Sequence, residues 1–245
     1  ILLETTMRFK ISSILVLLVT FSLTSTKSLS DTLPLPPALI PFTANEGETL
    51  LLDSQAKEDY FLLSNQFVTQ INQAYCGVAS SVMVLNALGL TAPESPQYKP
   101  FKVFTQENFF DRAETKQVVS PEIVSRRGMT LAQLGGLLSS HGAKTRVYYG
   151  ADVDLNQFRS VLVQNLSMRD NFTIINYLRK SIGQERGGHI SPIAAYNLKT
   201  DRFLILDVAR YKYPPVWVKA VDLWQSIRSI DSDSGKTRGF VLVGK

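Results

Sequence analysis

The sequence predicts an α+β fold, a helical lobe packed against an antiparallel β-sheet lobe, and three observations support this. The chain has 245 residues, of which 44% are hydrophobic, so it can bury a substantial core. Helical periodicity dominates the first half of the part that begins near residue 42, whereas short segments rich in β-branched and aromatic residues dominate the second half. Helices followed by strands are typical of α+β domains rather than of alternating α/β folds.

The amino-terminal region, residues 1–30, has the pattern of a secretory signal peptide. Arg8 and Lys10 form a positive start, and an apolar run over 11–23 is followed by small polar residues. Hydroxyl residues interrupt this run, which is shorter than the roughly 20 residues that span a bilayer. We therefore expect an exported, periplasmic protein, with a membrane-anchored or cytoplasmic location as the alternatives.

The next stretch, residues 31–41, reads DTLPLPPALIP and contains four prolines. Proline favours extended, polyproline-like backbone over helix or sheet, so this stretch is expected to be a linker or an arm lying on the domain. Residues 42–245 show no internal repeat and are expected to form one catalytic domain.

Four helices are predicted from periodicity and capping residues. In 76–88 the apolar residues 78, 82 and 85 share one helix face, and Gly89 is a natural stop. Two further segments begin with a Ser or Thr cap, and a fourth continues the helical pattern. These three segments are 120–128, 130–142 and 155–166. Five strands are predicted at 173–178, 189–197, 203–209, 216–221 and 240–244.

The charge of the chain argues against a nucleic-acid partner. The formal net charge is +5 and the isoelectric point is about 9.3, but Lys and Arg are scattered and no nucleic-acid motif accompanies them. A basic surface of this kind suits small anionic ligands.

Cys76 is the only cysteine of the chain, so no intramolecular disulfide can form. It stands in NQAYCGVASS, at the expected first turn of a helix, where the macrodipole and unpaired backbone N–H groups favour a thiolate. The alternative is a buried structural cysteine, since cysteine is among the most buried residue types.

A nucleophilic cysteine needs a base and a group that orients the base. His189 opens the strand GGHISPIAAYN, and Asp207 follows an apolar run on the next predicted strand. The midpoint of 189 and 207 is residue 198, inside the turn 197–201, so a hairpin places both side chains at nearly the same height. His141, at an expected helix end where a cation suits the negative terminus, is interpreted as structural.

Gln70 precedes Cys76 by six residues in a non-helical stretch. Its side-chain amide and the backbone N–H of Cys76 are expected to form an oxyanion hole. Gln, Cys, His and Asp then fill four catalytic roles in order along the chain.

This order resembles the papain-like cysteine hydrolases, whose papain-like fold is α+β. The longer strings NQAYCGVASSVMVLNALG, GGHISPIAAYN and LDVARYKYPPVWV resemble the catalytic domain of phytochelatin synthase, in particular its short bacterial form. The resemblance covers about residues 42–245. It implies Cys76 as nucleophile, His189 as base and then acid, Asp207 as orienting group, and Gln70 as oxyanion donor.

The resemblance also implies a reaction and a substrate site. The family cleaves glutathione, releases glycine and holds γ-glutamylcysteine as a thioester, which water or a second glutathione then takes; the short forms lean toward hydrolysis. Arg179 and Arg238 match positions near the substrate, and a guanidinium suits the substrate's carboxylates. Surface ion pairs are the alternative for both arginines. Gly188, one of two glycines before His189, is expected to let the substrate approach closely.

No cofactor is expected, because no Cys or His cluster has metal-ligand spacing. Heavy-metal ions such as cadmium are expected only as thiolate complexes of glutathione, and a homodimer is left open. Two other functions are considered. A related peptidase of the bacteriocin-leader type cleaves after double glycine, and a non-catalytic exported binding domain needs no reactive thiol.

Overall fold

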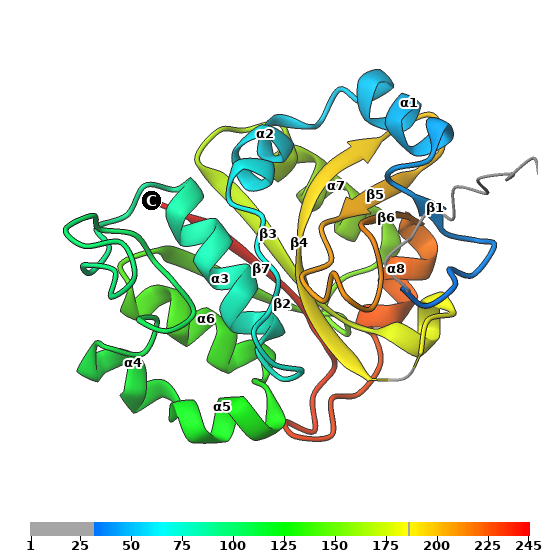
Figure 1. The fold of residues 1–245 in the computed structure, drawn as a ribbon. Helices are drawn as coiled ribbons and strands as arrows, with labels where there is room; N and C mark the ends of the chain where they lie inside the picture. Colours follow the sequence, from blue (N-terminus) through cyan, green and yellow to red (C-terminus); the bar gives the residue numbers. More distant parts are fainter. Residues whose placement is uncertain (1–31, 186) are drawn as a thin grey trace, which may run out of the picture.

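The computed structural model describes residues 32–185 and 187–245 (Figure 1). The signal peptide predicted for residues 1–30 lies outside these residues and stays a prediction. Among the residues that are described, no helix has both the length and the apolar character needed to cross a membrane.

One antiparallel sheet of seven strands forms the centre of the described chain, with the strand order β1-β6-β5-β4-β3-β7-β2. Strand β4 lies in the middle, paired with β3 on one side and with β5 on the other. The strands are β1 (Ile40–Pro41), β2 (Lys144–Tyr149), β3 (Asn171–Leu178), β4 (Gly188–Asn197), β5 (Arg202–Ile205), β6 (Val216–Lys219) and β7 (Gly239–Gly244).

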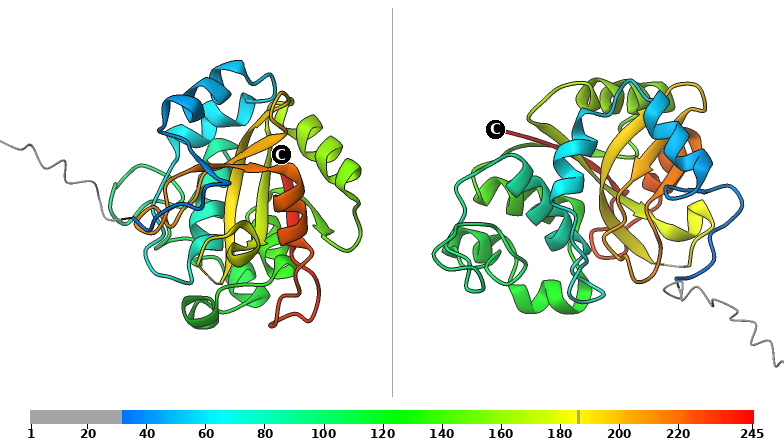
Figure 2. Two further views of the ribbon diagram at one scale, coloured as in Figure 1. Left: turned by 90° about the vertical axis from the view of Figure 1, so that its right-hand side faces the viewer. Right: turned by 45° about the horizontal axis from the view of Figure 1, so that its top comes forward.

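Helices cover both faces of the sheet (Figure 2), and each face has its own hydrophobic core. Helices α3 and α6 supply most of the helical residues of one core, with α1 and α2 adding to it, while α7 and α8 pack in the other. The helices are α1 (Asn45–Asp53), α2 (Glu58–Asn65), α3 (Cys76–Ala87), α4 (Ala113–Val118), α5 (Pro121–Arg127), α6 (Leu131–Ser140), α7 (Leu155–Leu166) and α8 (Ala220–Ile227), with a short 3₁₀ helix η1 (Arg179–Ile182).

The helix starts agree with the capping signals of the sequence. Thr130 begins α6 with a capping box, in which its hydroxyl accepts from the N–H of Gln133 while the Gln133 side chain accepts from the N–H of Thr130. Ser120 caps α5 in the simpler way, through the N–H of Ile123. The α+β class is confirmed, because these helices pack on an antiparallel sheet.

Two parts of the predicted element order are wrong. The predicted strand over 216–221 ends at Lys219, and the chain continues as α8, whose residues Ala220, Leu223 and Ile227 are buried at helical spacing. Strand β2, over residues 144–149, was missed, so the helices do not all precede the strands. The sheet therefore lies between two helical layers instead of beside a single helical lobe.

The proline-rich stretch behaves as an arm on the domain rather than as a free linker. Leu33 N donates to Lys212 O at 3.0 Å, and Ile40 and Pro41 pair with β6 as strand β1. Leu39 is buried in the core on the α7 and α8 side. Residues 32–41 are thus tied to the loop that follows β5.

His141 ends α6 and is surrounded by core residues. The centroid of its ring lies 5.1 Å from that of Phe104 and 4.7 Å from that of Phe109. Burial, assisted by the charge of Arg112, lowers the pKa of His141 to about 4. Its packing agrees with a structural role, but the expected cation at the helix end is wrong, because the ring is neutral at pH 7.

A buried neutral histidine makes the fold sensitive to acid. In the unfolded chain the imidazole takes up a proton below about pH 6.5, whereas in the folded chain it does so only near pH 4, so stability falls between these values. When the pH is lowered from 7 to 5, the free energy of unfolding of the wild type should fall because His141 resists protonation. In His141→Gln this fall should be smaller by about 2 kcal/mol. Urea unfolding at both pH values measures this difference. Equal losses in the two proteins would contradict the prediction.

Candidate active site

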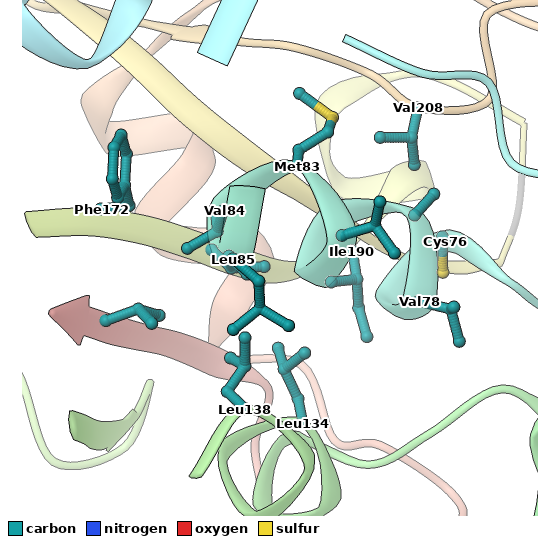
Figure 3. Packing of buried hydrophobic residues seen from close by; sticks show 14 of the residues in the cluster. Cys76, Val78, Met83, Val84, Leu85, Leu134, Leu138, Phe172, Ile190 and Val208 are labelled. Atoms are coloured by element: carbon teal, nitrogen blue, oxygen red, sulfur yellow. The ribbon is translucent and has the colours of Figure 1, made fainter. Parts of the chain in front are cut away.

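Helix α3 crosses β4 and brings the thiol of Cys76 to the start of that strand. Ser80, one turn into α3, donates its hydroxyl to the carbonyl of Cys76 at 2.8 Å and also lies 3.1 Å from the carbonyl oxygen of Ile190 in β4. Figure 3 shows Cys76 at the first turn of α3, with Leu134 and Leu138 of α6 pointing toward the helix. As the first residue of α3, Cys76 has a backbone N–H that the helix does not use.

The residue after the cysteine packs directly against Met129. A Cβ added at Gly77 would lie 2.5 Å from the sulfur of Met129, so a side chain here would require the methionine side chain to move. Gly77, directly after Cys76, therefore lets the first turn of α3 pack closely against Met129.

The carboxylate of Asp207 reaches the imidazole of His189 from the chain segment after β5. The hairpin of β4 and β5 is confirmed, but β5 ends at Ile205, so Asp207 is not in a strand, and a register shift lies between Ile193 and Ala195. Asp207 Oδ1 still lies 2.8 Å from His189 Nε2. Since Nε2 is occupied in this way, Nδ1 is the ring nitrogen available to the thiol.

The three side chains favour a thiolate and an imidazolium. Burial alone would raise the pKa of the Cys76 thiol, but the neighbouring ring of His189 and its charge lower the pKa below its ordinary value. For His189, burial is the largest influence and disfavours the charged ring, but the charge of Asp207, its hydrogen bond to the ring and the neighbouring Cys76 thiol together raise the pKa. A lowered pKa favours a reactive thiolate at this position in the free protein.

Arg179 stands behind the carboxylate that orients the histidine. Its Nη1 lies 2.8 Å from Asp207 Oδ2 and its Nη2 donates to Oδ1 at 3.0 Å, while Gln184 accepts from Nη1. Its guanidinium also lies over the ring of Tyr213, at 5.1 Å from the centroid. The fork expected to bind a substrate carboxylate is therefore engaged by a carboxylate of the protein, and direct substrate binding by Arg179 stays a prediction.

This arrangement keeps the orienting carboxylate ionised. Burial alone would raise the pKa of Asp207, but His189 and Arg179 together hold the pKa below its ordinary range. The N–H of Ala209 also donates to Oδ1, at 2.9 Å. A fully buried Asp207 is tolerated because it is paired with charges and hydrogen bonds.

Gln70 is buried beside this cluster and its amide is held in place. Its backbone N–H donates to Val208 O at 2.9 Å, and its side-chain Nε2 donates to Asn72 O at 2.7 Å and to the hydroxyl of Tyr211 at 3.1 Å. Both amide protons are thus engaged in the free protein, and donation to an oxyanion stays a prediction.

Arg238 lies over the start of β4, next to the thiol. Its Nη1 donates to Asn176 Oδ1 at 2.9 Å, and its Nη2 lies 3.6 Å from Asp231 Oδ1. A Cβ added at Gly188 would collide with Nη1 of Arg238. The absence of a side chain at Gly188 therefore makes room for the guanidinium of Arg238, and no unusual backbone conformation requires a glycine here.

A cavity of about 590 Å³ joins these groups, a volume usual for sites of small ligands. We call it the first cavity. Cys76 and His189 form its floor, and its walls carry charges of both signs. The charged lining residues are Arg126, Arg127, Arg238, Asp231 and Asp233.

The structure brings Cys76, His189 and Asp207 together as predicted, and it adds residues that sequence reasoning missed. Ser191, two residues after His189 on the same side of β4, lies 3.0 Å from His189 Nε2, and only the period-2 spacing pointed to it. Tyr211 carries no sequence signal for its contact with Gln70, because 141 residues separate the two.

A metal site was not expected, and that expectation remains untested. Within residues 32–185 and 187–245, no group of three or more His, Cys, Asp or Glu side chains is arranged to hold a metal ion.

The comparisons with known proteins agree with the strings quoted above. The family model described as phytochelatin synthase matches residues 30–240. A glutathione gamma-glutamylcysteinyltransferase 1 of Arabidopsis thaliana is 37% identical over 216 residues, 87% of this chain and 43% of its own. Its counterpart of Lotus japonicus is 34% identical over the same share of this chain and 42% of its own. The glutathione gamma-glutamylcysteinyltransferase of Schizosaccharomyces pombe is 30% identical over 85% of this chain and 50% of its own. The chain thus spans about half the length of these relatives.

The shifted pKa values predict thiol reactivity at low pH. An ordinary cysteine reacts with iodoacetamide as its thiolate, with a pKa near 8.5. We expect the alkylation rate of Cys76 to reach half its maximum below that pH, and Asp207→Asn to shift the midpoint upward, because the imidazolium loses its partner. Mass spectrometry follows the reaction without ambiguity, since Cys76 is the only cysteine. The exposed Asp53→Asn variant serves as control, and a wild-type midpoint of 8.5 or above would refute the ion pair.

Proposed function

Because the chain belongs to the phytochelatin synthase family, we propose that it is a glutathione γ-glutamylcysteinyltransferase acting through a thioester on Cys76. It releases glycine from glutathione and passes the γ-glutamylcysteinyl group to water or to a second glutathione. The observation that carries this proposal is that the Cys76 thiol and a His189 ring held by Asp207 line one cavity, whose walls carry charges of both signs.

The proposal includes a papain-like fold. In support, a cysteine at the start of a helix packs against an antiparallel sheet that supplies the histidine, with the acid just after the neighbouring strand. The same architecture is compatible with a double-glycine peptidase. The family match favours the transferase, because the relatives that it resembles are named for glutathione.

In the first half-reaction the thiolate of Cys76 attacks the carbonyl carbon of the peptide bond between the cysteine and the glycine of glutathione. The imidazolium of His189 then gives its proton to the departing amine of glycine, and a thioester remains on Cys76. Asp207 keeps the ring in position and stabilises its charge, and Arg179 keeps the carboxylate ionised.

The oxyanion of the tetrahedral intermediate is stabilised by the backbone N–H of Cys76 and by the amide of Gln70. For this the N–H of Gln70 that points at Tyr211 has to turn toward the substrate, while the shorter bond to Asn72 O holds the other amide proton. The preorganised part of the hole is thus the helix terminus, and the glutamine completes it when substrate binds.

The γ-glutamyl end of glutathione carries an α-carboxylate and an α-ammonium group, and the first cavity offers partners for both. Arg238 is held in a fixed orientation by Asn176 and lies beside Gly188, where it suits the carboxylate. Asp231 and Asp233 line the same cavity and suit the ammonium group. A cavity with charges of one sign would fit only half of this zwitterion.

Water and a second glutathione compete for the thioester, and hydrolysis is proposed as the major outcome. Heavy-metal ions such as cadmium enter as part of the substrate, bound to the thiolate of glutathione, and the mechanism needs no metal bound by the chain itself.

The covalent intermediate is the direct test of the proposed function. When the protein is quenched with acid in the presence of glutathione, mass spectrometry is expected to detect a γ-glutamylcysteinyl adduct on Cys76, and amino-acid analysis to detect free glycine. Cys76→Ser and His189→Ala should lose at least about 1,000-fold of the glycine release, while His141→Gln keeps most of it. Cleavage of a double-glycine leader peptide, with no glycine released from glutathione, would favour the peptidase instead.

Gly188 tests the binding role of Arg238. In Gly188→Ala the new methyl group displaces the guanidinium from its bond with Asn176, so part of the substrate's binding energy is lost. We expect KM for glutathione to rise about tenfold with a smaller change in kcat, because this contact is made in the ground state and in the transition state alike. Steady-state kinetics measures both constants, and an unchanged KM would separate Arg238 from the substrate.

A further inference from the structure

Ser191 in β4 carries a buried hydroxyl, and within the described residues both of its hydrogen-bond partners belong to the region of the catalytic base and acid. Ser191 is fully buried, and Ile175, its cross-strand partner in β3, is buried as well. A hydroxyl in apolar surroundings needs hydrogen-bond partners. The partners are Nε2 of His189, at 3.0 Å, and the backbone N–H of Val208, at 3.3 Å. Ser191 therefore joins the base to the segment that carries the acid.

The contact with Val208 exists because the chain leaves the regular ladder here. Strand β5 ends two residues before Asp207, although Leu206 N still donates to Pro192 O at 3.0 Å. Pro192 has no N–H with which to return a bond. The N–H of Val208 donates to the side chain of Ser191 instead of to a strand carbonyl. The hydroxyl thus fixes the backbone directly after Asp207.

The position of the ring proton decides what Ser191 does for His189. The pKa of Asp207 is held below its ordinary range despite burial, so the carboxylate is ionised and can only accept. The proton in the 2.8 Å contact between Asp207 Oδ1 and His189 Nε2 therefore belongs to Nε2. A nitrogen that carries this proton has no lone pair to offer, so Ser191 is also an acceptor. Its two lone pairs suffice for Nε2–H and for the N–H of Val208.

A second acceptor for Nε2–H has two consequences. Hydrogen bonding to the charged form of a group favours that form, so the hydroxyl favours the imidazolium. It also restricts rotation of the ring, which fixes the direction of Nδ1. Ser191 does not line the first cavity, so any influence on the reaction there passes through His189.

We propose that Ser191 is a positioning residue for proton transfer: its hydroxyl shares the Nε2 proton of His189 with Asp207 and holds the imidazolium with Nδ1 available to the thiol of Cys76. The catalytic meaning of this inference rests on the proposed function, which it deepens by naming a residue that supports the base. The hydroxyl then influences the ionisation of the thiol without touching a substrate.

Other charged and titratable groups act on the same ring and thiol, so a test has to leave them in place. They come from α3, β3, η1, the segment after β5 and the residue before β7. These groups are Cys76, Tyr177, Arg179, Asp207, Tyr211 and Arg238. Ser191→Ala removes one oxygen atom and none of these groups. A change in thiol ionisation is then due to the hydroxyl.

The experiment measures the pH at which Cys76 becomes reactive. Alkylation of the wild type and of Ser191→Ala by iodoacetamide is followed by mass spectrometry, and circular dichroism confirms the fold at each pH. We expect the midpoint to rise by about one pH unit in Ser191→Ala, the effect of losing a hydrogen bond to a charged group. In ¹⁵N NMR the ring of His189 should lose its proton at a correspondingly lower pH. His141, the other histidine, is neutral at pH 7 and serves as internal reference.

Steady-state kinetics with glutathione separates positioning from binding. In Ser191→Ala we expect kcat for glycine release to fall about tenfold with KM nearly unchanged, because proton transfer is affected and the substrate contacts are not. Ser191→Thr keeps the hydroxyl and should keep the wild-type midpoint and kcat.

The matched control is Ser226→Ala, which removes an equally buried hydroxyl that donates to Leu223 O in α8, and it should leave the midpoint unchanged. In a His189→Ala background, Ser191→Ala should have no effect on the midpoint, because the ring through which it acts is absent. A shift that persists in this background overturns the proposal. An unchanged midpoint in Ser191→Ala does the same, as does a Ser191→Ala chain that fails to fold, since the hydroxyl then serves the fold.

The outcome for Ser191 is distinguishable from the outcome for the proposed function, since alkylation and NMR need no glutathione. If the predicted shifts occur and the wild type releases no glycine, the positioning role stands and the proposed function fails. If glycine is released and the midpoint of Ser191→Ala equals that of the wild type, the proposed function stands and the positioning role fails.

Discussion

The crossing of α3 over β4 is the contact on which the rest of the site depends. The Ser80 hydroxyl lies within hydrogen-bond distance of a carbonyl in each element, that of Cys76 in the helix and that of Ile190 in the strand. Cys76 carries the thiol, and His189, which carries the imidazole, directly precedes Ile190. The Ser80 side chain therefore ties the backbones of the thiol and imidazole residues together. Buried apolar residues of α3, α6 and the sheet pack around this crossing, which leaves few other arrangements for the helix.

The charges at the site balance within a small buried volume. Asp207 is paired with Arg179, while the lowered pKa of the Cys76 thiol and the raised pKa of His189 favour a negative sulfur beside a positive ring. A buried charge without a partner is costly, so the loss of any one of these groups affects the ionisation of the others. Arg179 thereby influences the nucleophile through Asp207 and the histidine. Arg179, which the sequence suggested as a ligand of the substrate, thus contacts the carboxylate of Asp207 instead.

Features that local interactions control could be predicted from the amino-acid sequence. Capping residues marked the starts of α5 and α6, a cysteine stood at the first residue of α3, and the turn near residue 198 implied the hairpin that brings His189 toward Asp207. The partner of Arg179 and the contact of Gln70 with Tyr211 could be found only in the folded chain. These depend on contacts between distant segments, and side-chain periodicity carries no information about which distant segment a polar group meets.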